Sequence, residues 1–220
     1  MSLLMYTSAP ESVWVVTDTL ATDGTAGRPF LFTSKCSPVP HMRMLIAGTG
    51  IAALTDRWRD IVQTRILALD APMLDLHAPG ALRTIWVALA AENELAEQTA
   101  TVYHFGYDAE KEEHRTFVYR SSSNFESEYQ VPAFAVKPGP DGDYEPPNDI
   151  DQIIALADRI RTEQAALPEG ERIYIGGELV LTTLTGDTSA AQVIYRFPDF
   201  VQDWQAMNGQ PVPTAPSGLT

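Results

Sequence analysis

The sequence predicts an α+β protein in which two antiparallel β-sheets carry helices packed on their outer faces. Strand-like runs come first, two helical stretches follow, and strands then resume. This order departs from the strict strand and helix alternation that builds a parallel, doubly wound sheet. The chain has 220 residues, 45% of them hydrophobic, which is enough to bury one substantial core. We therefore expect a single domain over residues 1–205 and a flexible C-terminal tail over residues 206–220.

Each expected element follows from its hydrophobic period and from the turn residues beside it. Short apolar runs between clusters of Pro, Gly, Asp and Ser predict strands over residues 3–6, 13–16, 30–33 and 43–47. After Gly50 the period becomes helical, with Ile51, Leu54, Trp58, Ile61, Val62 and Leu69 at the inward positions. A second helix is expected over residues 79–98, with Pro79 near its first turn.

The second half of the chain returns to strands, which are expected over residues 102–107, 116–120, 129–136, 173–185 and 191–197. Residues 137–149 are dense in Pro, Gly and acidic side chains, so they predict an exposed connector. A third helix follows, and Asn148 is expected to cap it. It is the only helix that the sequence predicts between Val136 and Ile173.

Composition excludes several classes of partner. The formal net charge of −14 opposes binding to nucleic acid or to an anionic membrane surface. No apolar run approaches the roughly 18 residues of a membrane span, and the N-terminus lacks the basic start and apolar stretch of a secretory signal. The single cysteine rules out an internal disulfide and suits a reducing compartment. We therefore expect a cytoplasmic protein.

Cofactor chemistry has little support in the sequence, and neither a metal nor another cofactor is expected. The four histidines show no paired metal-ligand spacing, and His104 is interpreted as a half-buried strand residue. Asp141, Asp143 and Glu145 alternate as calcium ligands do, but the later Gly and Glu of a calcium loop are absent. Cys36 is interpreted as a packed side chain because no base is readable near it.

The first fifty residues hold the side chains with the clearest chemistry. Removal of Met1 leaves Ser2 with a hydroxyl and a free α-amine, so nucleophile and base share one residue. An α-amine titrates at about 7.7–8.0. A nearby ammonium such as Lys35 favours the uncharged amine, and a carboxylate such as Asp18 holds that lysine in place. Together with the turn at Gly48, these residues predict an amide-cleaving site at the N-terminus of the chain.

Four runs of the sequence carry a resemblance to a known family. They are V-V-T-D-T-L-A-T-D-G, then S-K, then M-L-I-A-G-T-G at the start of a helix, and I-Y-I-G-G-E-L-V-L-T-T-L near the end. Their succession resembles a proteasome β-type subunit, within the N-terminal-nucleophile hydrolases. The resemblance implies a four-layer αββα sandwich, homo-oligomeric rings or stacked rings, and hydrolysis of a peptide or small amide substrate by the first residue.

Carried over residue by residue, the resemblance places Ser2 at the position of the nucleophile, which is usually Thr. Asp18 and Lys35 fall on its acidic and basic partners, and Gly48 falls on the backbone donor to the oxyanion. Losing such a donor typically costs about 10²–10³ in rate. The family's Ser-Gly-Ser turn, and the Asp and Ser ahead of its Gly-Gly strand, are missing. The corresponding stretches read V-P-A-F-A-V-K-P-G and E-R-I-Y-I.

Three hypotheses for function follow. The first is a threonine- or serine-type amidohydrolase or peptidase, and the second is a noncatalytic assembly subunit of the same fold. The third is a dinucleotide-binding protein, because residues 44–53 contain G-x-G-x-x-A and Asp70 follows about twenty residues later. Plainer interpretations also stand, with Ser2 as an ordinary start residue, Asp18 as a turn residue and Lys35 as a surface charge.

Overall fold

The computed structural model describes residues 2–22, 27–92, 98–186 and 188–209, which form two five-stranded antiparallel sheets. The first sheet has the order β10 (Ala133–Lys137), β1 (Leu4–Ser8), β2 (Ser12–Asp18), β11 (Glu178–Thr185) and β12 (Thr188–Arg196). The second has the order β5 (Cys36–Val39), β6 (Met44–Gly50), β7 (Ala100–Asp108), β8 (Glu113–Arg120) and β9 (Ser127–Gln130). A separate two-stranded ribbon consists of β3 (Leu20–Thr22) and β4 (Pro29–Phe32).

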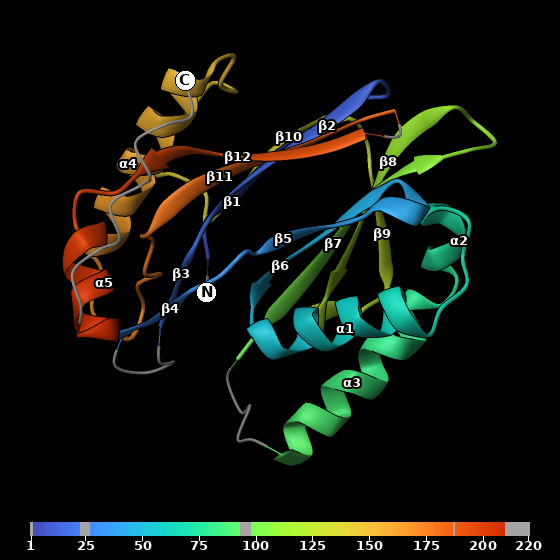
Figure 1. The fold of residues 1–220 in the computed structure, drawn as a ribbon, viewed down its shortest axis with the longest axis horizontal. Helices are drawn as coiled ribbons and strands as arrows, with labels where there is room; N and C mark the ends of the chain where they lie inside the picture. Colours follow the sequence, from blue (N-terminus) through green and yellow to red (C-terminus); the bar gives the residue numbers. More distant parts are fainter. Residues whose placement is uncertain (1, 23–26, 93–97, 187, 210–220) are drawn as a thin grey trace.

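The helices fall into two groups, one beside each sheet (Figure 1). The helices α1 (Ala52–Thr64), α2 (Ala71–Asp75) and α3 (Ala78–Glu92) lie beside the second sheet, whereas α4 (Ile150–Ala165) and α5 (Phe200–Asn208) lie beside the first. Two 3-10 turns, η1 (Pro40–Met42) and η2 (Ser121–Ser123), complete the described elements. This arrangement confirms the predicted α+β class with antiparallel sheets. Within the described ranges, no helix is long and apolar enough to cross a bilayer.

Alternating strand residues contribute to three separate apolar clusters. In β2, Val15 packs into the cluster between the two sheets, together with Phe105 of β7. The next residue, Val16, packs on the opposite face of the sheet with Ile160 of α4. The third cluster contains Trp58 and lies between α1–α3 and the second sheet. Strand β2 is therefore buried on both faces, which explains the continuous apolar run at residues 13–16.

Two of the expected elements differ in the structure. The helix expected over residues 51–69 already ends at Thr64, and the short helix α2 begins only at Ala71. The strand expected over residues 129–136 is two strands, β9 and β10, which belong to different sheets. Pro132 lies between them and has no N–H to donate to a strand ladder, so the chain leaves one sheet there and enters the other.

Three boundaries in the second half also differ from the predictions. Asp149 caps α4 in place of Asn148, because its carboxylate accepts the Gln152 N–H at 2.8 Å. Strand β11 begins at Glu178, directly after Gly177 with its φ of +76°. Helix α5 is not predicted by the sequence pattern, and it crosses the expected boundary at residue 205. Residues 210–220 of the expected tail lie outside the described residues, so the division into domain and tail stays a prediction.

His104 in β7 is fully buried, whereas the sequence predicted a half-buried side chain. Its Nε2 accepts a 2.7 Å hydrogen bond from the indole N–H of Trp58, and the two rings are stacked. Burial lowers the pKa of His104 to about 3. Protonation at Nε2 would also turn the acceptor of the tryptophan N–H into a donor. The side chain is therefore neutral in the folded protein at ordinary pH.

This histidine is expected to make the protein less stable in acid. Because the unfolded chain takes up a proton near pH 6.5 and the folded one only near pH 3, stability is full above pH 6.5 and falls below it. The loss approaches about 1.4 kcal/mol for each pH unit. His104→Gln keeps an acceptor for Trp58 without titrating. Denaturant unfolding of both proteins from about pH 7 to about pH 4 should show a shallower decline for the variant, and equal slopes would contradict the assignment.

Candidate functional site

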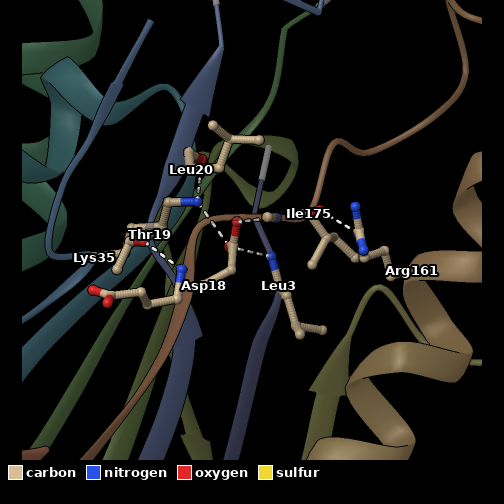
Figure 2. A network of polar contacts seen from close by, with 9 residues as sticks. Leu3, Asp18, Thr19, Leu20, Lys35, Arg161 and Ile175 are labelled. Atoms are coloured by element: carbon tan, nitrogen blue, oxygen red, sulfur yellow. Dashed lines mark hydrogen bonds and ion pairs between the residues drawn. The ribbon is translucent and has the colours of Figure 1, made fainter. Parts of the chain in front are cut away.

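A buried ion pair joins Asp18, at the end of β2, to Lys35, just before β5 (Figure 2). The Lys35 ammonium is 2.7 Å from Asp18 Oδ1, and it also donates to the carbonyl of Leu20 at 2.6 Å. The two side chains are 9% and 0% exposed for Lys35 and Asp18 respectively. The interpretation of Lys35 as a surface charge is therefore wrong, and two of the predicted site residues are in direct contact.

Burial drives both members of this pair towards their neutral forms. It raises the pKa of the Asp18 carboxyl and lowers the pKa of the Lys35 ammonium, while each charge opposes the change at its partner. The carboxylate also accepts two backbone N–H groups, which favours its ionised form. A buried lysine with a lowered pKa gives up its proton more readily than an exposed one. The Asp18 carboxylate opposes that loss, which favours Lys35 as an ammonium in the ion pair.

The same carboxylate holds the first strand at its beginning. Asp18 Oδ1, which binds the lysine, also accepts the backbone N–H of Leu3 at 3.0 Å, and Asp18 Oδ2 accepts the N–H of Gly176 at 3.3 Å. Figure 2 shows Leu3 and Lys35 meeting at this carboxylate. Ser2 precedes Leu3 and is 8% exposed. The peptide bond between Ser2 and Leu3 therefore lies beside the ion pair.

Gly48 lies opposite Lys35 across the pairing of β5 with β6. Its backbone N–H, predicted as the oxyanion donor, donates to the carbonyl of Lys35 at 3.2 Å. A Cβ at Gly48 would lie 1.9 Å from the Thr55 hydroxyl oxygen, so α1 packs against this strand as closely as glycine allows. Gly48 is therefore bonded through its backbone to Lys35, and the role of its N–H in binding an oxyanion stays a prediction.

Three further residues close the site and were missed by the sequence analysis. The hydroxyl of Thr19 accepts the N–H of Glu178 at 2.8 Å, which ties the end of β2 to the beginning of β11. A Cβ at Gly177 would lie 2.4 Å from this hydroxyl, and one at Gly176 would lie 2.9 Å from Leu20. The Gly-Gly pair is the sequence signal that could have located this close approach.

The part of the chain that the structure describes lacks the arrangement of strands on which the dinucleotide-binding hypothesis depends, so that hypothesis is wrong. Such a site needs a parallel βαβ unit with the glycine turn before its helix, but β6 pairs antiparallel with both β5 and β7. Asp70, the acidic residue that follows the glycine motif, instead caps α2 by accepting the Met73 N–H at 3.0 Å. Cys36 is packed between the sheets as predicted, and burial raises the pKa of its thiol to about 12.

Other candidate binding features do not coincide with the ion pair. A pocket of about 240 Å³ lies between α4, α5 and the segment before β11, with Arg161, Arg172 and Asp199 among its lining residues. Neither Ser2, Asp18 nor Lys35 lines it. Over the described part of the chain, no group of three or more His, Cys, Asp or Glu residues could hold a metal ion.

Solved structures share this fold, and two of them match it over nearly their whole lengths. Anbu (ancestral beta-subunit) from Yersinia bercovieri has a TM-score of 0.58 and 12% sequence identity, with 99% of this chain and 100% of that chain covered. An Anbu Gly-1 mutant from Hyphomicrobium sp. strain MC1 has a TM-score of 0.56 and 11% identity, with 95% and 94% covered. At these identities the similarity concerns the fold.

These comparisons correct the family prediction. The sequence runs resemble a proteasome β-type subunit, but the structural neighbours are Anbu proteins, which are proteasome-like and form a distinct family. The assignment to the proteasome β-type subunits is therefore wrong. No family model and no curated protein matches the sequence.

Proposed function

We propose that this chain is an N-terminal-nucleophile hydrolase with a four-layer αββα architecture, which cleaves a peptide or small amide bond through Ser2. The observation that carries the proposal is the shared oxygen Asp18 Oδ1, which accepts from the Lys35 ammonium and from the N–H of Leu3. One buried carboxylate thus connects the lysine to the beginning of the chain. A hydroxyl and an α-amine on Ser2 would lie beside that lysine.

In the proposed reaction, the Ser2 hydroxyl oxygen attacks the substrate carbonyl carbon, and the hydroxyl proton passes to the α-amine of the same residue. The tetrahedral oxyanion collapses to an ester on Ser2 when the carbon–nitrogen bond breaks. The leaving amine takes the proton from the α-ammonium. Water then attacks the ester while the α-amine accepts a proton from it, and the acid product leaves as the serine hydroxyl is restored.

The other residues support this proton transfer. The positive charge on Lys35 favours the uncharged α-amine, because a nearby ammonium disfavours a second one. Asp18 orients Lys35 and prevents it from moving into solvent. The Gly48 N–H is the proposed donor to the oxyanion. In the structure this N–H donates to the Lys35 carbonyl at 3.2 Å, so the proposed role requires a substrate oxygen to share or displace that bond.

The proposal predicts one covalent adduct on a correctly processed chain. Intact-mass measurement should show that Met1 is removed, since acyl transfer by this route needs the free amine. A β-lactone probe should then acylate the protein once, and fragmentation should place the adduct on Ser2. A processed chain that forms no adduct, or forms one elsewhere, would refute the hydrolase proposal.

A noncatalytic assembly subunit of the same fold is the second candidate. It is favoured by the engagement of the Gly48 N–H with a backbone carbonyl and by the missing Ser and Asp groups of the proteasome-like pattern. Both candidates include a homo-oligomeric ring or stacked ring. A stable oligomer in light scattering, combined with an unreactive and correctly processed Ser2, would select the assembly function.

A further inference from the structure

Two side chains of α4 bind the segment that leads from α4 to β11, and Leu20 and Phe197 donate backbone N–H groups to its carbonyls at Gly176 and Gly177. Residues 172–177 belong to no strand. Gln164 accepts the N–H of Ile173 at 2.9 Å, and Arg161 Nε donates to the carbonyl of Ile175 at 3.0 Å. Because Arg161 and Gln164 are three residues apart, they lie on one face of the helix. Alternate residues of the extended segment are thus attached to neighbouring positions of α4.

One peptide group connects Arg161 to the candidate site. The carbonyl of Ile175 receives the arginine N–H, and the N–H of the same peptide, at Gly176, donates to Asp18 Oδ2 at 3.3 Å. Figure 2 shows Arg161 on one side of this segment and Asp18 on the other. A cation at the carbonyl end and a carboxylate at the N–H end polarise the peptide in the same direction, so each hydrogen bond strengthens the other.

We propose that Arg161 is a positioning residue for Asp18, because it fixes the peptide whose N–H orients the carboxylate towards Lys35 and the beginning of β1. The expected effect of Arg161 on the reaction rests on the proposed function. Its expected effect on residues 172–177 rests on the hydrogen bonds alone. A backbone N–H, whose peptide carbonyl is bound by an arginine, thus contacts Asp18 directly after the stretch E-R-I-Y-I.

The charged groups around this connection are few. Among the described residues, Lys35 is the charged side chain in contact with Asp18. Arg161 forms an ion pair with Asp199, at the beginning of α5, and its guanidinium carbon lies 4.9 Å from the centre of the Phe197 ring. Asp203 of α5 and Tyr195 of β12 also interact electrostatically with Arg161. Since Asp199 compensates the guanidinium, the effect on Asp18 passes through the peptide group.

The test compares Arg161→Met with Arg159→Met, a matched loss of arginine from the same helix. Arg159 pairs with Glu163 and with carbonyls of the connector, and it has no hydrogen bond to residues 172–177. Two quantities are measured on the full-length protein. The first is hydrogen exchange of the peptide that contains Gly176, and the second is the pH dependence of Ser2 acylation by the β-lactone. Arg161→Lys serves as the conservative variant.

In Arg161→Met, amide exchange in this segment is expected to rise at least about tenfold, the equivalent of one charge-assisted hydrogen bond. The acidic limb of the acylation profile should move to higher pH, because a less well oriented N–H leaves the pKa of Asp18 higher. Arg161→Lys should restore part of both effects, and Arg159→Met should show neither.

Unchanged exchange at this segment in Arg161→Met would overturn the proposal, and so would faster exchange without a shifted acidic limb in an enzyme that reacts. If the wild-type protein does not react with the probe, the proposed function fails. The exchange measurement then decides by itself whether Arg161 holds the peptide that contacts Asp18.

Discussion

Replacing Ser2 by Ala is expected to reduce acylation and amide hydrolysis by at least about 10³-fold, since the proposed ester intermediate forms on the Ser2 hydroxyl. The fold should be unaffected, because Leu3 keeps its backbone hydrogen bond to Asp18 and only one hydroxyl is lost. The rates are measured with a β-lactone and with a fluorogenic peptide amide. Thermal unfolding of the same samples checks that the wild type and the variant are both folded.

Two control variants separate the hydroxyl of Ser2 from its amine. Ser2→Thr keeps both groups and should retain activity within about tenfold. Insertion of a glycine between Met1 and Ser2 keeps the hydroxyl and transfers the free amine to the new first residue, so activity should fall almost as far as in Ser2→Ala. Wild-type rates in Ser2→Ala would show that the nucleophile lies elsewhere. Full activity in the insertion variant would show that the α-amine is not the base.

The second large effect concerns the buried ion pair. Asp18→Asn removes the partner of Lys35 and leaves an ammonium without compensation at a site where its side chain is 9% exposed. Breaking a buried pair in this way typically costs about 3–5 kcal/mol in the free energy of unfolding. Lys35→Met is expected to be similarly harmful, because it leaves Asp18 as a buried carboxylate. Neither variant should react with the probe.

The double variant Asp18→Asn with Lys35→Met should recover most of the lost stability without recovering activity. Removing both charges also removes the cost of burying them, so replacing a buried pair by neutral groups is often nearly neutral. Denaturant unfolding of the wild type, the two single variants and the double variant gives the interaction energy directly. A double variant that is as unstable as the sum of the single variants would show that the two charges do not stabilise each other.

Local patterns predicted several parts of this protein well. The helical period from Ile51 to Val62 gave α1, because one apolar face must meet the sheet. The antiparallel α+β class followed from the order of strand-like and helical runs. Local patterns did not show that residues 129–136 divide between two sheets. Nor did they predict α5, where Phe200 is the one buried residue and provides little period to read.

For the candidate site, residue type and spacing indicated Asp18 and Lys35, which are 17 positions apart and meet across neighbouring elements. The contact of Asp18 with Gly176 spans 158 positions, and the Gly-Gly pair indicates only that some other part of the chain approaches closely there, without identifying Asp18. Arg161 has no sequence signal at all, because its partner is a backbone carbonyl that every residue possesses. Backbone contacts of this kind depend on where the segments pack and not on their side chains.

The sequence by itself determined the α+β class, the helix after Gly50, and the choice of Asp18 and Lys35 as candidate partners. Only the tertiary structure decided that Asp18 is wholly buried, that one of its oxygens serves both Lys35 and Leu3, and that Gly176 reaches it. The physical reason is that a local sequence pattern reports backbone dihedral preferences and the burial of one face of a helix or strand. The site forms where β1, β2 and the segment before β11 are brought together by packing on both faces of a sheet.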